Sequence, residues 1–430
     1  MKTRRAIEKI YPLSGMQEGM LFNWLMDKKS NVYFVQNTLG IRGELDVQVF
    51  EEAFRLIIKR YGIFRTVFVH NRLRMPQQVV LKEVEWGVQA EDISDMDEGC
   101  QAIYVEEFKR RDREKGFDLE RDVPARMAVI KIGPQLYKFI CSFHHIILDG
   151  WCMGIILDEF FHTYNELVQG RALTINRRKA HQYSGYIEWL QKQNREEGRA
   201  YWSRYLEGYE QQATVPFRKG KGGNSRYTLE KRSFRLDGGV TERLQELAGR
   251  YNTTVSMVLH AVWGLLLQRY NNTNDVVFGS IISGRPSEVE GIESMPGLFI
   301  NTVPVRFRCG DDEPFSRVLS RLQEDFVTSN TYGYIPLAEI QSASQLKNSL
   351  FDNILAFENY PIARKETQNE DGNEKELEII AEDNFEQTTY DFIMVAVGAI
   401  VRTPSGTLYR YGVFNHGLAN IPAVFLIVYQ

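Results

Sequence analysis

The sequence predicts an α/β protein built from two lobes of similar make-up. Strand-like runs and amphipathic helical runs alternate through both halves of the chain. A length of 430 residues suits two or three domains, and no short-period repeat is visible. We therefore expect an N-terminal lobe over residues 1–175 and a C-terminal lobe over residues 176–430.

The composition excludes several classes of protein. The chain is 43% hydrophobic and 25% charged, as soluble globular proteins are. A net charge of −4 gives no basic footprint for nucleic acid. No apolar run is long enough for a signal peptide or a membrane span, so we expect a cytoplasmic protein. The four cysteines lack metal-site or disulfide spacing, so we expect no metal; they are Cys100, Cys141, Cys152 and Cys309.

The first lobe is predicted to open with a helix and to contain a β-hairpin. Ser14 is the expected cap of a helix within 11–26, and Asp46 caps a strongly amphipathic helix over 47–61. The other expected elements are strands at 32–41, 65–69 and 77–81, a charged helix and loop within 94–122, and a hairpin of 125–132 with 135–143.

The second lobe repeats this alternation of helices and strands. We expect helices within 181–208 and at 240–251, 254–270 and 314–328, and strands at 275–283, 298–308, 390–401 and 407–414. Loops are expected at 216–227, 284–297 and 364–376, where turn-forming or charged residues gather. The apolar C-terminal residues 423–429 are predicted to form a buried strand.

A histidine pair lies at the end of the strand predicted over 135–143. His144 and His145 precede three aliphatic residues, and Asp149-Gly150 supplies a turn before a helix over 151–168. Successive strand residues point to opposite faces, so one imidazole can line a cleft while the other is held in the wall. Histidine pairs are more often structural than catalytic. Only seven histidines occur in the chain, however, and two of them are adjacent beside this turn.

Seven short motifs occur in order along the chain. They are Tyr11–Phe22, Arg60–Phe68, His144–Gly150, Tyr183–Trp189 with Tyr201-Trp202, Gly297–Arg306, Tyr334–Leu337, and Leu350–Asn353 continuing through Phe357–Pro361. Together they resemble the condensation domain of non-ribosomal peptide synthetases, over about residues 10–415. The family commonly has His-Glu where this chain has Tyr61-Gly62, so a polar role at that place is in doubt.

The resemblance implies a fold and a reaction. The implied fold has two chloramphenicol acetyltransferase-like lobes, each a mixed sheet flanked by helices, arranged as a V around a central tunnel. The implied reaction is amide formation between a donor thioester on an upstream carrier protein and the amine of an acceptor on a downstream carrier. Phosphopantetheine arms of the carriers deliver both substrates, and the domain itself binds no cofactor. An adjacent adenylation domain and a place in secondary metabolism, such as antibiotic biosynthesis, are also implied.

His145 is the predicted catalytic residue, because a neutral histidine accepts a proton near pH 7. Two roles stay open for it, that of a general base and that of a group that positions the amine and stabilises the intermediate. His144 is predicted to be structural. Gly150 is predicted to make the turn, leave room beside the reacting atoms and offer an N–H to the oxyanion.

Asp149 is predicted to hold the turn through a buried ion pair, a role that the resemblance implies. Its candidate partners are Arg65 and Arg306. Six further residues are expected near the substrate tunnel, although packing or a helix cap explains several of them equally well; they are Ser14, Gln17, Trp151, Trp202, Asn301 and Thr302.

Two other functions remain open from the sequence. An epimerisation domain of the same family also uses the histidine pair, but its glycine-rich segments are not evident here. A non-catalytic docking platform for carrier proteins is the third hypothesis, which the intact His145, Asp149 and Gly150 disfavour. A donor of L configuration is favoured over one of D configuration. Residues 415–430 lack the closing amphipathic helix usual in the family, so we expect either an altered end or a strand.

Overall fold

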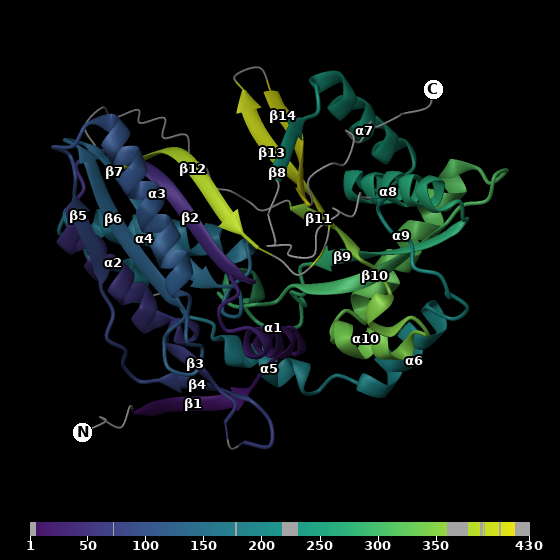
Figure 1. Ribbon diagram of the computed structural model, residues 1–430, viewed down its shortest axis with the longest axis horizontal. Coiled ribbons are helices and arrows are strands. Elements are labelled where there is room, and N and C mark those ends of the chain that lie inside the picture. Colours follow the sequence, from purple (N-terminus) through teal and green to yellow (C-terminus); the bar gives the residue numbers. More distant parts are fainter. Residues whose placement is uncertain are drawn as a thin grey trace, which may run out of the picture. The chain divides into compact units, whose positions relative to one another are not determined.

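The computed structural model describes residues 6–71, 73–176, 179–216, 231–358, 377–387, 390, 392–403 and 406–417. These residues form two compact units of mixed helices and sheets (Figure 1). Unit 1 comprises 1–192, 285–299 and 361–388, and unit 2 comprises 193–284, 300–360 and 389–430. The predicted α/β class is confirmed. Unit 1 runs past the predicted division at residue 175 to residue 192, and it also includes two later segments of the chain. The predicted V shape and tunnel stay predictions.

The main sheet of unit 1 has five strands in the order β12-β2-β7-β6-β5. Its strands are β12 (Glu378–Glu386), β2 (Phe34–Arg42), β7 (Leu136–His144), β6 (Ala125–Gly133) and β5 (Val88–Asp92). β7 pairs antiparallel with both β2 and β6, which confirms the predicted hairpin. A second sheet consists of β1 (Ile7–Pro12), β4 (Gln77–Leu81) and β3 (Thr66–Val69). The strand that carries the histidines is therefore central and buried.

Helices cover both faces of the five-stranded sheet. Phe139 of β7 packs against Phe50 and Phe160, whereas its neighbour Ile140 belongs to an apolar cluster with Phe108 on the other face. The helices of unit 1 are α1 (Gly15–Met26), α2 (Val47–Arg60), α3 (Glu98–Lys115), α4 (Trp151–Val168) and α5 (Tyr183–Leu190), with short 3₁₀ turns η1 (Gly62–Arg65), η2 (Thr174–Asn176) and η3 (Ile292–Ser294).

Local capping signals were reliable guides to where helices begin. The Ser14 hydroxyl accepts a hydrogen bond from the Gln17 N–H, and the Gln17 side chain accepts one from the Ser14 N–H, which completes a capping box. The Asp46 carboxylate accepts from two N–H groups of the first turn of α2. Both predicted caps are confirmed.

Unit 2 contains a six-stranded mixed sheet in the order β10-β9-β11-β13-β14-β8. The strands are β10 (Asn301–Arg308), β9 (Asp275–Ile282), β11 (Asn353–Glu358), β13 (Phe392–Thr403), β14 (Gly406–Gly417) and β8 (Lys231–Arg235). Its helices are α6 (Arg195–Tyr205), α7 (Gly238–Arg250), α8 (Val255–Asn271), α9 (Phe315–Thr331) and α10 (Leu337–Ala343), with the turn η4 (Lys347–Ser349). Trp263 of α8 stacks on Phe392 and donates a hydrogen bond to Asn353, which joins the helix to the sheet.

The sequence pattern missed the edge strands β1, β5, β8 and β12 and the central strand β11. β5 illustrates the edge strands, because none of its residues is fully buried and only Val88 and Ala90 are apolar, so the run gives a weak strand signal. The apolar run of β11 is too short to be told from a piece of helix. The loop predicted at 364–376, all but one residue of that at 216–227, and residues 418–430 lie outside the described residues.

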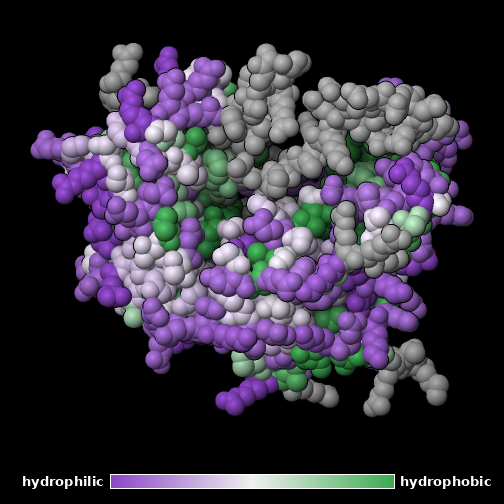
Figure 2. All heavy atoms as spheres, turned by 180° about the vertical axis from the view of Figure 1, so that it is seen from behind, coloured by the Kyte–Doolittle hydropathy of each residue, from purple (hydrophilic) through white to green (hydrophobic). Residues whose placement is uncertain are grey.

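Hydrophilic side chains predominate on the face shown in Figure 2, and hydrophobic ones gather in smaller groups. Within the described ranges, no helix combines the length and the apolar character needed to cross a membrane.

A buried histidine in unit 2 predicts a measurable pH dependence of stability. His260 of α8 is 1% exposed, with Nδ1 2.7 Å from the Ser256 carbonyl and Nε2 2.8 Å from the Ser280 hydroxyl. Burial lowers its pKa to about 4. Below about pH 6.5 the unfolded chain binds a proton there that the folded chain does not.

We therefore expect His260 to remove stability as the pH falls from about 6.5 to about 4, by roughly 3 kcal/mol at the lower end. The measurement compares the unfolding free energies of the wild type and His260→Gln at several pH values. The variant should show a shallower loss at acid pH; parallel curves would contradict a buried, neutral His260.

Candidate active site

The histidine turn connects the central strand β7 to helix α4, as predicted. His144 ends β7 opposite Phe34 of β2, and the His145 N–H donates to the Tyr33 carbonyl at 2.7 Å. The three aliphatic residues that follow, Ile146 to Leu148, are almost fully buried. They anchor the turn in the core, which fixes where both imidazoles and Asp149 lie.

Gln17 braces the turn from helix α1. Its amide Nε2 donates to the Ile146 carbonyl and to Gln78 Oε1, both at 3.0 Å, and Gln78 donates back to Gln17 Oε1 at 2.8 Å. Gln17 is fully buried, and Ser14 caps its helix. These contacts give both residues a role in holding the turn, while their predicted place near a tunnel stays a prediction.

His144 is held as a neutral side chain. Its Nδ1 accepts a hydrogen bond from the Ile146 N–H at 3.1 Å, so the neutral ring carries its proton on Nε2. Burial, helped by the charge of His145, lowers the pKa of His144 to about 3. Nε2 is buried and has no hydrogen-bond partner among the described residues. These surroundings suit the structural role predicted for His144.

His145 has different surroundings. Its Nε2 lies 3.5 Å from Oε1 of Glu386, and its side chain is 12% exposed. Burial by itself lowers the pKa of His145, but the hydrogen bond and charge of Glu386, with the charge of Asp149, raise that pKa above its usual value overall. The surroundings therefore favour the neutral form of His144 and the protonated form of His145. His145 is the ring equipped to take up a proton, and its catalytic role stays a prediction.

Asp149 is buried in a closed network of hydrogen bonds. Its Oδ1 lies 3.2 Å from Nη2 of Arg285 and accepts from the Cys152 thiol, and its Oδ2 accepts from the Phe299 N–H at 3.0 Å. The side chains of Asp149 and Arg285 are 0% and 5% exposed. This ion pair ties the histidine turn to the segment 285–299.

The predicted partners of Asp149 were wrong. Arg65 instead bonds to Glu8 at 2.7 Å and to the Ile58 carbonyl, so it joins η1 to β1. Arg306 forms a two-pronged pair with Asp275 between β10 and β9 in unit 2. Both guanidinium groups are engaged by nearby carboxylates. The sequence signal that we missed is an arginine between two turn residues, Gly284 and Pro286.

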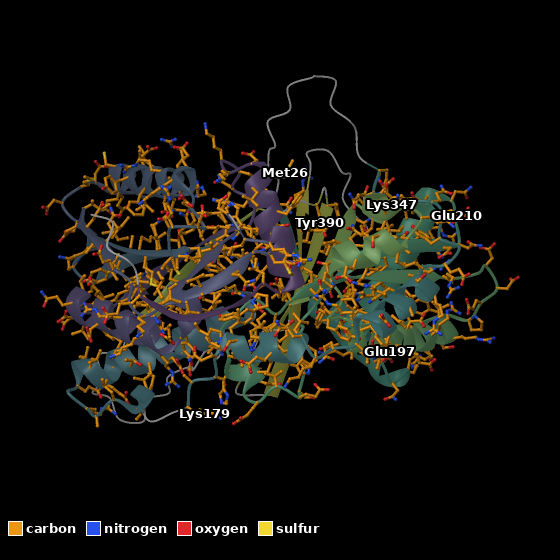
Figure 3. All side chains as sticks on the ribbon, turned by 90° about the horizontal axis from the view of Figure 1, so that it is seen from below. Met26, Lys179, Glu197, Glu210, Lys347 and Tyr390 are labelled. Atoms are coloured by element: carbon orange, nitrogen blue, oxygen red, sulfur yellow. The ribbon has the colours of Figure 1, made fainter. Side chains whose placement is uncertain are left out.

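The segment 285–299, which carries Arg285, contacts the rest of unit 1 at several points. The Arg285 guanidinium lies 4.0 Å from the Phe299 ring centre, and the Tyr183 hydroxyl donates to the Leu298 carbonyl at 2.6 Å. A Cβ atom on Gly297 would lie 2.2 Å from the ring of Tyr183, so only glycine fits there. Lys179, labelled in Figure 3, pairs with Glu290 at 2.7 Å.

Gly150 has an ordinary backbone conformation. It is the N-cap of α4 with φ −60° and ψ −30°, which any residue adopts. Trp151 follows it and donates from Nε1 to the Glu293 carbonyl at 3.1 Å. The N–H groups of a first helical turn have no partner within the helix, and the predicted oxyanion role of Gly150 stays a prediction.

The other predicted site residues lie in unit 2, where they brace local structure. Trp202 donates to the Tyr332 carbonyl, and Asn301 donates to the carbonyls of Gly333 and Ile335, both at 2.8 Å. The Asn301 side chain also accepts from the N–H of Thr302. Their predicted place beside a tunnel stays a prediction.

Tyr61 and Gly62 both make polar contacts, although they depart from the motif. The Tyr61 hydroxyl donates to Glu159 at 2.9 Å, and the Gly62 N–H donates to Gln182 at 2.9 Å. Burial raises the pKa of Tyr61 to about 12, so the hydroxyl stays protonated.

The chemistry available at this site is proton transfer by a histidine beside a carboxylate. In the described part of the chain, no group of three or more His, Cys, Asp or Glu side chains is arranged to hold a metal ion. Sequence reasoning missed Glu386, because its strand was not predicted.

Curated relatives of this chain are synthases much longer than it. Two plipastatin synthase proteins of Bacillus subtilis (strain 168) match it. One is 43% identical over 402 residues, covering 93% of this chain and 11% of that protein, and the other is 44% identical over 398 residues, covering 91% and 15%. Gramicidin S synthase 2 of Brevibacillus brevis is 38% identical over 391 residues, covering 91% and 9%. The chain thus spans only a small part of these relatives.

Solved structures of condensation domains share the fold. The first condensation domain of the CDA synthetase superposes with a TM-score of 0.73 at 19% identity, covering 96% of this chain and 93% of that one. A variant of the starter condensation domain of rhizomide synthetase gives 0.74 at 16% identity, covering 94% and 88%. The family model described as "Condensation domain" matches residues 7–401. This chain therefore belongs to the condensation-domain family of non-ribosomal peptide synthetases.

Proposed function

We propose that this chain forms peptide bonds in non-ribosomal peptide synthesis. The α-amine of an aminoacyl thioester on an acceptor carrier protein attacks the carbonyl carbon of an aminoacyl or peptidyl thioester on a donor carrier. A C–N bond forms and the C–S bond breaks, while one proton passes from the amine nitrogen to the departing thiolate. The observation that carries this proposal is His145, paired with Glu386 at the end of a central strand in a chain of the condensation-domain family.

His145 is the group that moves the proton in this proposal. A histidine near neutral pH takes a proton from an attacking amine and returns it to a leaving group. Holding both substrates in line supplies much of the acceleration, so the histidine contributes a limited part of it. His144 and Asp149 keep the turn in place through the Ile146 N–H and Arg285.

The substrates arrive on partner proteins in this proposal. Phosphopantetheine arms of an upstream and a downstream carrier present the two thioesters, and an adenylation domain of the same synthetase activates the amino acids. The similarity to plipastatin and gramicidin S synthases supports these partners. It also supports a product of the same broad class, a secondary metabolite such as a peptide antibiotic.

The test uses two carrier proteins loaded with defined aminoacyl groups, the donor in L or D configuration. We expect a dipeptide on the acceptor carrier by mass spectrometry, only when this chain and both loaded carriers are present, and in higher yield with the L donor. Inversion of the donor without any new amide would identify an epimerisation domain. No carrier-dependent product with any pair would favour a docking platform and overturn the proposal.

A further inference from the structure

Strand β12 brings a carboxylate to the histidine turn from a distant part of the chain. β12 pairs antiparallel with β2, and β2 pairs antiparallel with β7, so the three strands lie side by side (Figure 1). Glu386, the last residue of β12, lies opposite Val35 of β2. Val35 in turn lies opposite Phe143, two residues before His145. The pairing of the three strands thus places Glu386 near the end of β7.

Tyr33 links the end of β12 to the backbone of His145 through two backbone hydrogen bonds. Its N–H donates to the Gln387 carbonyl at 2.9 Å, and its carbonyl accepts from the His145 N–H at 2.7 Å. Tyr33 has a φ of 65°, in the left-handed region that a residue with a Cβ atom rarely adopts. Such a conformation persists only where its surroundings enforce it, and it is common at functional sites. Both backbone groups of this strained residue therefore fix His145 relative to the end of β12.

The titratable groups around His145 come from three elements. Glu386 approaches from β12 with its Oε1 3.5 Å from Nε2, His144 precedes it on β7, and Asp149 follows in the turn. His144 is neutral, because burial holds its pKa at about 3. The oxygens of Asp149 are engaged by Arg285 and by the Phe299 N–H. Glu386 is the carboxylate that contacts the His145 ring, whereas Asp149 acts on the ring through its charge.

We propose that Glu386 is a positioning residue for His145, orienting its imidazole and stabilising the imidazolium that forms during aminolysis. This inference rests on the proposed function. His145 takes the proton from the amine nitrogen as the C–N bond forms, and gives it to the thiolate as the C–S bond breaks. A charged imidazole in this mostly buried place costs free energy, and an adjacent carboxylate offsets that cost.

The first test measures the proton affinity of His145 directly. The imidazole resonances of the seven histidines are titrated by NMR in the wild type and Glu386→Gln, with His145 assigned from its absence in His145→Ala. We expect the pKa of His145 to fall by about one unit or more in Glu386→Gln. The matched control is Glu378→Gln at the other end of β12, where an exposed glutamate pairs with Arg42 at 3.0 Å. The control should leave the His145 titration unchanged.

The second test follows amide formation in single-turnover reactions between loaded carriers. Glu386→Gln should be about 10- to 100-fold slower than wild type at pH 7, a part of what a full general base contributes. The acidic limb of its rate–pH profile should move to lower pH, because the base must be neutral to accept a proton and its pKa has fallen. Glu386→Asp, which keeps the charge on a shorter side chain, should recover part of the rate. Glu378→Gln should behave as wild type.

The outcomes separate this inference from the proposed function. If the wild type made no amide from any pair of loaded carriers, the proposed function would be overturned, whatever the NMR titration shows. An active wild type, with Glu386→Gln matching Glu378→Gln in the His145 titration, the pH profile and the rate, would overturn the role of Glu386. A slower Glu386→Gln with an unshifted His145 titration and pH profile would show that the strand end matters only for structure, which also overturns it.

Discussion

His145→Ala is expected to slow single-turnover amide formation between loaded carriers by about 10²- to 10⁴-fold, the usual contribution of a general acid–base group. The ring is mostly buried beside Glu386 at the end of a central strand, so its removal takes away the proton acceptor without touching the core residues Ile146 to Leu148. The rate is measured by rapid quenching and mass spectrometry of the acceptor carrier. The remaining rate reports what the alignment of the two tethered substrates provides alone.

A matched control for this variant is His162→Ala in helix α4. The His162 side chain is 50% exposed and contacts Glu166 and Thr174 on the surface of unit 1. We expect this variant to keep the wild-type rate. If His145→Ala also kept the wild-type rate, chemistry at His145 would be excluded, and either pure proximity or a docking function would remain.

Arg285→Met is expected to give the largest loss of stability, about 3–5 kcal/mol in the free energy of unfolding. The substitution leaves the Asp149 carboxylate fully buried without its cation. It also removes the hydrogen bonds from Arg285 to the carbonyls of Ile292 and Met295, which shape the segment 285–299. Urea denaturation followed by circular dichroism measures the loss, and the condensation rate should fall with it because Asp149 holds the turn.

Two comparisons make this prediction specific. Arg199→Met removes a partly exposed pair with Glu339 and should cost less than about 1 kcal/mol. The double variant Arg285→Met with Asp149→Asn removes the unpaired charge, while Asn still accepts from the Phe299 N–H, so it should be more stable than Arg285→Met alone. A double variant less stable than Arg285→Met would argue against an unpaired charge as the cause.

Local signals in the sequence were enough for much of the fold. Ser14 and Asp46 mark where two helices begin, because their side chains bond to N–H groups two or three residues away. The hairpin of β6 and β7 was predicted because two apolar, strand-like runs flank the turn Gly133-Pro134. The histidine turn between strand and helix was also found, since every signal for it lies within a few residues.

The partners within the site depend on contacts between distant segments. Arg65, Arg285 and Arg306 all have buried side chains paired with a carboxylate, so residue type alone cannot show which one reaches Asp149. Glu386 was missed for a similar reason. Its strand lies at the edge of the sheet with exposed residues, and the pairing with β2 that brings it to His145 leaves no local pattern.

Gly150, in the histidine turn, has the right-handed helical backbone conformation, which any residue adopts. The special backbone of this site is instead at Tyr33, a residue whose type gives no hint of a positive φ.

The most direct test of the central claim is the stoichiometry of a single turnover between one donor-loaded and one acceptor-loaded carrier. Condensation predicts that free thiol on the donor carrier and dipeptide on the acceptor carrier appear together, at equal rates and in a one-to-one ratio, and that both slow equally in His145→Ala. Release of donor thiol without dipeptide, or an inverted donor that stays on its own carrier, would contradict the claim that His145 serves amide formation.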